Sequence, residues 1–423
     1  MAEKIDTIVV GAGQAGISMS EHLSLCGIEH LVLEQSRVAE AWRTARWDSL
    51  LANGPAWHDR LPTIAIPADP TSFPHKETIA DYLVAYAEHI KAPIRTGVEV
   101  KAVRKLARQL GFMVETSAGD FEVMNVIAAT GPFQRPVIPP IIPEVPGLKQ
   151  LHSYHYKNPD QLPQGAVMVV GSGASGAQIA DELNKAGRKV YLSMGRHERP
   201  IRYYRGVDSG FWSGATGSWN STQSSLDAQN VPIAISGLYP RRPIDFRRMA
   251  AEGLVLLGST EAYANGRLHF KNNLQENIEY GNNSYLSALK RADDYVEYNG
   301  LPLAEDPLAY EIPPPTIFET DPILEIDPTE VNLTSIVWAT GFARDYSWIK
   351  LDIFNENHNP IHLRGVAKEP GIYFLGLPFQ GNRGSSFLFG VWHDAKYLAD
   401  HISVRNGYQN YLKRKLASLA GQA

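Results

Sequence analysis

The sequence predicts an α/β protein with two Rossmann-like dinucleotide-binding domains, the second inserted into the first. Three observations support this fold class. A hydrophobic strand, a glycine-rich turn and a helix start occur twice, once near the N-terminus and once from Ala166 onward. Each unit is followed by a second strand, and at 423 residues the chain is longer than a single core usually is. We therefore expect two domains that can bury a large cofactor.

The first glycine-rich unit reads DTIVVGAGQAGISMSEHLSLCGIEHLVLE. Gly11 permits the tight turn, Gly13 lets a pyrophosphate approach the backbone, and Gly16 lets helix and strand pack closely. Free N–H groups at the helix start attract the phosphates. Glu34 stands 23 residues after Gly11, where a carboxylate accepts hydrogen bonds from an adenosine ribose and repels a 2′-phosphate. This unit predicts a site for FAD or NAD(H).

The second unit repeats the glycines at the same spacing, as Gly171, Gly173 and Gly176. Its tip differs, because the position equivalent to that of the acid falls at Ser193 and is followed by Arg196 and Arg199. A hydroxyl and cations suit a 2′-phosphate, so this unit predicts NADPH. On spacing alone, two solvated surface arginines are the alternative. The two units together indicate a flavoprotein that receives hydride from NADPH.

Two apolar strands end in Ala-Thr-Gly, one before and one after the second unit; the later one contains Thr340 and Gly341. Small residues let backbone pass close to a cofactor or to the other domain. The strands predict where the chain leaves the first domain and returns. The expected boundaries are an FAD domain at 1–157, an NADPH domain with an insertion at 158–325, and the rest of the FAD domain at 326–423.

A helix start is expected near Ser385, after the glycine-rich loop that follows the return. Its positive end would stabilise negative charge on a reduced flavin. An ordinary surface loop is the alternative. The segment between Gly206 and Pro315 has no repeat, and it either shapes a substrate entrance or covers the second domain.

Composition narrows the function class. A formal charge of −5 offers no basic surface for nucleic acid, and no apolar run has the length of a membrane span. The single cysteine, Cys26, has no partner for a disulfide, a redox pair or a metal site, so we expect a cytoplasmic protein without a metal centre. The N-terminus runs straight into a strand, which does not indicate export.

The whole chain resembles the class B flavin-dependent monooxygenases, most of all the bacterial flavin-containing type. The resemblance rests on both glycine units and on AWRTARWDSL, LLANGPAW and IVWATGF. It implies that Asn53, in NGP, sits near the reacting edge of the flavin, and that Trp42 and Arg43 lie along FAD. The segment from Gly147 to Tyr156 matches the family fingerprint only in part, because the spacing is one residue too long and a leading phenylalanine is absent.

The resemblance implies an NADPH-dependent enzyme with a small-molecule substrate and O2. FAD reduced by NADPH would form a C4a-hydroperoxyflavin, which transfers one oxygen to an amine nitrogen or a thioether sulfur. Baeyer–Villiger oxygenation of a ketone, typically with an arginine near the flavin, is one alternative. A sensor flavoprotein that binds both dinucleotides without a dedicated reaction is another. A disulfide reductase is excluded by the lack of a cysteine pair. Relatives often dimerise, which leaves a homodimer open.

Overall fold

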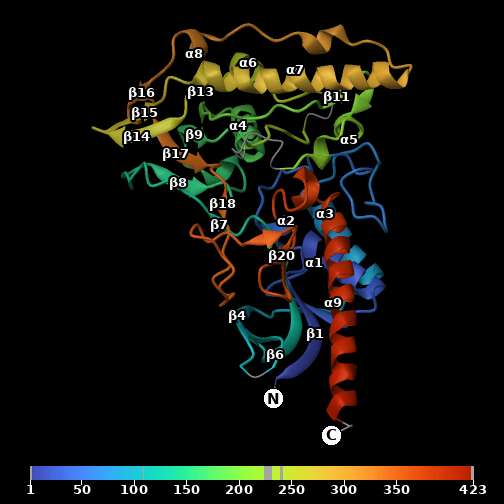
Figure 1. Ribbon diagram of the computed structural model, residues 1–423. Coiled ribbons are helices and arrows are strands. Elements are labelled where there is room, and N and C mark those ends of the chain that lie inside the picture. Colours follow the sequence, from blue (N-terminus) through green and yellow to red (C-terminus); the bar gives the residue numbers. More distant parts are fainter. Residues whose placement is uncertain (1, 108, 223–230, 239–241, 421–423) are drawn as a thin grey trace.

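The computed structural model describes residues 2–107, 109–222, 231–238 and 242–420. Two parallel-stranded sheets form two layered units, one above the other in Figure 1. The first unit contains both termini, and the second is built from the middle of the chain. The predicted α/β class with two dinucleotide-fold domains is confirmed.

The first sheet is mainly parallel around β1 (Glu3–Val10), whose apolar run TIVV is buried. Its order is β19 (His362–Leu363), β20 (Val366–Ala367), β21 (Ile372–Phe374), β6 (Phe121–Ala128), β1, β2 (His30–Glu34) and β3 (Ile94–Thr96). An antiparallel branch of β4 (Val100–Lys105) and β5 (Phe112–Thr116) joins β6. Both neighbours of β1 run parallel to it, so their carboxyl ends meet at one edge of the sheet.

Three helices cover one face of this sheet: α1 (Gln14–Leu25), α3 (Lys76–His89) and α9 (Val391–Ala420). They pack because their buried positions repeat with helical spacing, as Ile79, Leu83 and Tyr86 of α3 illustrate. The short α2 (Glu40–Thr44) follows β2. The far end of α9 runs down past the sheet to the C-terminus (Figure 1).

The second sheet is parallel throughout, in the order β13 (Val255–Leu257), β10 (Val190–Ser193), β9 (Ala166–Val170), β17 (Leu333–Trp338) and β8 (Lys149–His152). α4 (Ala174–Lys185), α6 (Phe246–Ala251) and the first turns of α7 (Leu274–Asn299) supply its helical core. α7 lies across the top of the molecule (Figure 1).

The domain crossing is a two-stranded ribbon in which β7 (Arg135–Pro136) pairs with β18 (Phe342–Ala343). This corrects the expected boundaries at 157 and 326, which assigned β8 and β17 to the first domain. Both strands belong to the second sheet, because β17 pairs with β9 on one side and β8 on the other. We place the change of domain at this ribbon.

The remaining elements surround the second sheet and its junction with the first. The insertion contains β11 (Tyr203–Tyr204), β12 (Val207–Asp208), α5 (Ser209–Ala215) and the 3₁₀ turn η2 (Ser218–Asn220). A small sheet of β14 (Thr260–Ala264), β15 (Arg267–Phe270) and β16 (Glu325–Ile326) lies beside it, with α8 (Ile317–Thr320) and the 3₁₀ turns η1 (Pro159–Gln161) and η4 (Pro307–Tyr310). Among the described residues, no helix combines the length and apolarity that crossing a bilayer requires.

Candidate functional site

A single cavity of about 1700 Å³ connects the two glycine cradles. Gly11 and Gly13 line it from the first unit, and Gly173 lines it from the second. Sites for one drug-sized ligand occupy about 300–1000 Å³. The cavity is therefore large enough for more than one ligand in contact.

The first cradle divides its glycines between packing and access. A Cβ on Gly11, at φ 105°, would lie 2.7 Å from the carbonyl oxygen of Ala129, and one on Gly16 would overlap the carbonyl of Gly11. A Cβ on Gly13 would meet no protein atom within 4 Å. Two glycines therefore let the backbone close up, and Gly13 leaves open space at the helix start.

The second cradle repeats this backbone. Gly171 has φ 116°, its Cβ would lie 2.5 Å from the oxygen of Ala339, and a Cβ on Gly176 would overlap the carbonyl of Gly171. Each Ala-Thr-Gly segment thus passes beneath its own cradle. At Gly173 the access is narrower, because a Cβ would lie 2.9 Å from Pro232.

Neither cradle helix is capped. Gly13 and Gly173 are the N-caps of α1 and α4, neither helix has a side-chain cap among the described residues, and neither first turn carries an acid. By contrast, side chains cap α3, α5 and α6, from His75, Asp208 and Asp245. Uncapped N–H groups at a helix start need an acceptor, and a phosphate is a suitable one. The residues therefore fit two pyrophosphate groups.

The first tip has the acid where the sequence predicts it. Glu34 lines the cavity, and its carboxylate accepts from the N–H groups of Ala12 and Ser36 at 2.8 Å each. These bonds fix the carboxylate beside the cradle, and each oxygen keeps a second lone pair for a ribose hydroxyl.

The second tip differs from expectation at two of its three residues. Ser193 is buried, and its hydroxyl donates to the carbonyl of Gly258 at 2.9 Å and accepts from the N–H of Thr260 at 2.9 Å. Arg199 is buried in an ion pair with Asp245 at 2.7 Å and also donates to Asn282. Both side chains are engaged by the protein itself, which argues against the phosphate role expected for them.

Arg196 remains the candidate at this tip. Its guanidinium is half exposed, bonds the exposed Glu276 and lies over the ring of Tyr280, with its Cζ 5.7 Å from the ring centroid. A surface pair of this kind is weak enough for a phosphate to replace the carboxylate. His197, beside it in the sequence, is not a cation at this tip: burial lowers its pKa to about 4, so its imidazole is neutral near pH 7.

Asn53 lies at the cavity wall and is held by the second domain. Gln178 Nε2 donates to the carbonyl of Ile235 at 2.7 Å and to Asn53 Oδ1 at 3.1 Å. Because the Ile235 carbonyl only accepts, it fixes the orientation of the Gln178 amide, which in turn makes the facing atom of Asn53 its oxygen. Asn53 Nδ2, with no acceptor in the described part of the chain, is left as a donor.

The backbone of Asn53 is also held from the second domain. Arg202 donates to the Asn53 carbonyl at 2.6 Å, and its guanidinium lies 4.8 Å over the ring of Phe73. Burial lowers the pKa of Arg202 to about 10, so it stays protonated near neutral pH. Nothing local in the sequence indicated either contact, since Gln178 and Arg202 lie 125 and 149 residues away.

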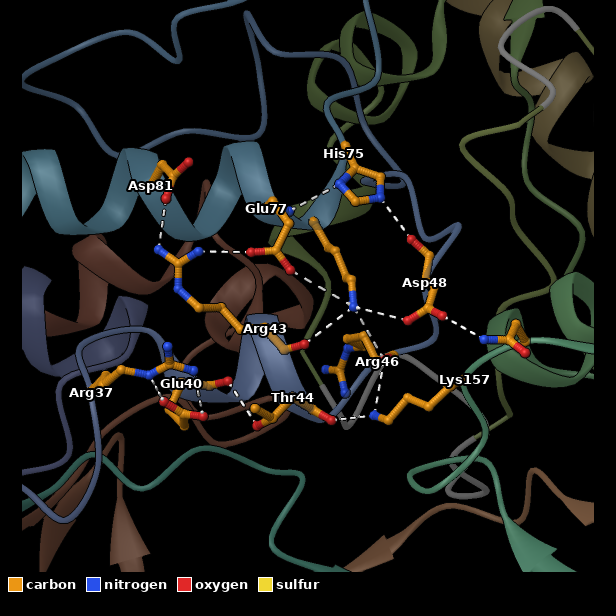
Figure 2. A network of polar contacts seen from close by, with 12 residues as sticks. Arg37, Glu40, Arg43, Thr44, Arg46, Asp48, His75, Glu77, Asp81 and Lys157 are labelled. Atoms are coloured by element: carbon orange, nitrogen blue, oxygen red, sulfur yellow. Dashed lines mark hydrogen bonds and ion pairs between the residues drawn. The ribbon is translucent and has the colours of Figure 1, made fainter. Parts of the chain in front are cut away.

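Of the two residues expected along FAD, Trp42 lines the cavity and Arg43 does not. Trp42 donates to Gln14 Oε1 at 3.3 Å, which joins it to the start of α1. Figure 2 shows the guanidinium of Arg43 turned to α3, where it bonds Glu77 and Asp81 at 2.7 Å each. Arg46, three residues on, is the arginine that reaches the cavity.

Two lysines hold the backbone that presents Arg46. Lys76 Nζ donates to the carbonyls of Arg43 and Arg46, and Lys157 Nζ to those of Thr44 and Arg46 (Figure 2). The Arg46 side chain lies over the ring of Phe133, 4.6 Å from its centroid, and burial lowers its pKa to about 10. It is a protonated, partly desolvated cation facing the cavity.

The second Ala-Thr-Gly segment meets the cavity through Ala339 and Gly341. The carbonyl of Gly341 accepts from His152 Nε2 at 2.9 Å, whereas Thr340 Oγ1 donates to the carbonyl of Val137 at the crossing ribbon. His152 has a pKa lowered by burial and fixes the hinge, as a structural histidine does. Thr340 belongs to the crossing and does not line the cavity.

The predicted helix start near Ser385 is displaced. Ser385 lies in the 3₁₀ turn η5 (Arg383–Ser386), is buried, and accepts from the N–H groups of Gly381 and Asn382. The long helix α9 begins at Val391, which does line the cavity. Ser385 shapes the loop that reaches the cavity through Ser386.

The single cysteine lies away from the cavity. Cys26 lies at the far end of α1, its Sγ is 3.9 Å from Asp400, and burial raises its pKa. Within the described ranges, no three His, Cys, Asp or Glu side chains are grouped to hold a metal ion.

Comparison with known proteins gives the family. The chain is 33% identical over 407 residues to the CzcO-like oxidoreductase of Geobacillus kaustophilus, which covers 95% of this chain and 99% of that protein. The chain belongs to the CzcO-like oxidoreductase family. A family model described as pyridine nucleotide-disulphide oxidoreductase matches residues 8–204 of this oxidoreductase.

Solved structures share the fold of this CzcO-like chain. The flavin-containing monooxygenase from Stenotrophomonas maltophilia is 18% identical, covers 95% of this chain and 99% of its own, and superposes with a TM-score of 0.66. OTEMO, in a complex with FAD and NADP, is 16% identical, with 98% and 87% coverage and a TM-score of 0.54. This likeness is one of fold, and it confirms the predicted two-domain dinucleotide-binding architecture.

Proposed function

We propose that this oxidoreductase is an NADPH-dependent flavin monooxygenase that transfers one atom of O2 to a nitrogen or sulfur of a small organic substrate. One observation carries the proposal: a single cavity joins two uncapped cradles, and Asn53 faces it, clamped by the second domain. FAD, when bound, supplies the redox chemistry that links NADPH to O2.

The chain's own residues bind and orient the reactants. The α1 start and Glu34 hold FAD, and the α4 start with Arg196 holds NADPH. Asn53 Nδ2 donates one hydrogen bond at the place where oxygen is transferred. An amide is a poor proton source, so it stabilises an oxygen atom by a hydrogen bond without protonating it. Protonation would favour the release of hydrogen peroxide.

Product analysis tests the function. We expect thioether-stimulated NADPH oxidation in which NADPH, O2 and sulfoxide are counted one to one to one. NADPH oxidation accounted for wholly by hydrogen peroxide, with amines, thioethers and ketones all unchanged, would instead favour the sensor flavoprotein.

The Gln178→Glu variant tests the role of Asn53. A carboxylate at this position cannot donate to Ile235, and it attracts Asn53 Nδ2 away from the cavity. We expect flavin content and flavin reduction to stay normal and hydrogen peroxide per NADPH to rise severalfold, as in Asn53→Ala. Gln178→Asn, which keeps an amide one methylene shorter, should fall between the parent protein and Gln178→Glu. Unchanged coupling in both Gln178→Glu and Asn53→Ala would remove the role of Asn53.

Baeyer–Villiger oxygenation is the second candidate, because a protonated arginine, Arg46, reaches the cavity. Incubation with cyclic ketones separates the two reactions. Lactone formation that Arg46→Ala abolishes, without loss of sulfoxidation, would make the ketone reaction the native one.

A further inference from the structure

Four rings form one continuous face of the cavity beside Asn53. His58, Trp219, Phe387 and Phe389, here called the aromatic wall, all line it. Phe389 stands at the centre, with ring centroids 4.2 Å from His58, 4.8 Å from Trp219 and 5.7 Å from Phe387. Flat apolar surfaces of this kind favour flat apolar ligands, through stacked or edge contacts.

The aromatic wall is assembled from three distant parts of the chain. The backbone beside η2 in the insertion accepts from η5, through Ser221 O and the N–H of Arg383, and Arg383 also forms an ion pair with Glu198. α5 packs directly on the third part, since a Cβ on Gly210 would lie 3.0 Å from His58. The insertion therefore shapes the chamber and does more than cover the second domain.

The aromatic wall continues to Asn53 through a carboxylate. His58 Nδ1 and Asp59 Oδ1 are 2.7 Å apart, and the Asp59 carboxylate lies against Gly54, the residue that follows Asn53. A molecule lying on the aromatic wall is thus within the same chamber as the amide that faces the cavity.

One hydrogen-bond donor in the aromatic wall has no acceptor. Trp219 Nε1 is buried, and none of the described residues bonds it. Trp212, seven residues earlier, also lines the cavity, but its Nε1 donates to the carbonyls of Tyr204 and Val207. The nearby hydroxyl of Thr216 is bonded as well. A buried N–H without a partner costs free energy that an arriving acceptor restores.

We propose that the aromatic wall is the substrate subsite, and that the substrate is a planar aromatic molecule with a carbonyl or carboxylate oxygen that accepts from Trp219 Nε1. This inference rests on the proposed function, because the bound molecule is a substrate only if the protein is a monooxygenase. It goes further by assigning the chemical class and the residues that select it.

Equilibrium titration of the oxidised holoprotein, followed by flavin absorbance, measures binding without turnover. Three probes isolate the two features: 4-(methylthio)acetophenone, thioanisole without the carbonyl, and cyclohexyl methyl sulfide without the aromatic ring. We expect Kd to rise at each step in that order by about threefold to tenfold.

Variants assign each step to a residue. Trp219→Phe keeps a ring and loses the N–H, so it should abolish the difference between the two aromatic probes and keep their advantage over the cyclohexyl probe. Phe389→Leu should weaken both aromatic probes and leave the cyclohexyl probe unchanged. Trp392→Phe is the matched control, because Trp392 lies outside the cavity and its ring stacks on His22 and His393, away from the aromatic wall.

Equal affinities for the three probes would overturn the inference. So would a Trp219→Phe protein in which flavin absorbance and retention change while the order of the probes does not, since the aromatic wall would then face the cofactor. Oxygenation of all three probes with equal Kd would defeat this inference and keep the proposed function. The expected order of Kd without any oxygenated product would keep the aromatic wall as a binding site and defeat the proposed function.

Discussion

The two cradles have the same backbone and differ at the tip of the following strand. In both, a carbonyl of the first glycine blocks a side chain on the third, and an Ala-Thr-Gly segment passes underneath. At the first tip, Glu34 is held by neighbouring N–H groups. At the second, Asp245 at the start of α6 and Glu276 and Asn282 in α7 hold the arginines. Cradle geometry is local, whereas selectivity at the second tip depends on tertiary contacts.

The largest expected difference is between the effects of replacing the two arginines of the second tip on the free energy of unfolding. Arg199→Ala leaves Asp245 buried without its partner, which is expected to lower the free energy of unfolding by about 3–5 kcal/mol. Arg196→Ala removes an exposed pair with Glu276 and a contact with the Tyr280 ring, and should change the free energy of unfolding by about 1 kcal/mol or less. Urea denaturation checks both values. If Arg199→Ala changed the free energy of unfolding only slightly, the ion pair with Asp245 would be weak and Arg199 would again be a candidate for binding the 2′-phosphate.

The third glycines should separate the two cofactors. A Cβ on Gly16 or Gly176 forces the helix away from its strand, at a cost of up to about 3 kcal/mol, or roughly a hundredfold in affinity. We expect Gly16→Ala to lose FAD on purification, and Gly176→Ala to stay yellow with a raised Kd for NADPH. Gly407→Ala is the control, since no atom would meet its Cβ. Loss of flavin from Gly176→Ala would reverse the assignment.

Acid should affect the second tip through His197. Its folded pKa of about 4 lies below the ordinary value of 6.5, so the unfolded chain binds the proton more readily. This stabilisation is present above pH 6.5 and declines as the pH falls toward 4, by roughly 2 kcal/mol at pH 5. Denaturation at pH 7.5 and 5 should show a smaller difference in His197→Gln than in the parent. Identical differences would mean that other groups cause the acid sensitivity.

Replacing Arg196 should have the smallest effect of these changes, and that effect should be specific to NADPH. Its removal is expected to raise the KM for NADPH about tenfold and to leave the KM for NADH unchanged, because only NADPH carries the 2′-phosphate. Steady-state kinetics with both nucleotides measure the ratio. A parallel rise for both would show that Arg196 acts on the fold or on a shared part of the nucleotide.

The sequence predicted the features that depend on short-range sterics. The glycine positions, the uncapped helix starts and Glu34 follow from a strand, a turn and a helix that are contiguous, and the structure has them where expected. Trp42 and Asn53, assigned by resemblance, also line the cavity.

The sequence missed what depends on distant pairing. Nothing near Arg199 announces Asp245, and spacing does not distinguish Arg43, which turns to α3, from Arg46, which reaches the cavity. The expected boundary put β17 in the first domain, because an apolar strand pattern does not indicate which sheet the strand joins. In the structure β17 pairs with β9 of the second sheet. The sequence around Gln178 does not predict its hydrogen bond to Asn53, which exists only because α4 packs against that residue.

The proposed function requires that the two cradles sort their cofactors across one cavity, with FAD at the tip that carries Glu34 and NADPH at the tip that carries Arg196. A crystal structure with FAD and NADP⁺ bound tests it most directly. We predict the FAD pyrophosphate at the start of α1 with its ribose on Glu34, and the NADP⁺ pyrophosphate at the start of α4 with its 2′-phosphate on Arg196. FAD lying against Arg196, or both nucleotides competing for one cradle, would contradict this sorting of the cofactors.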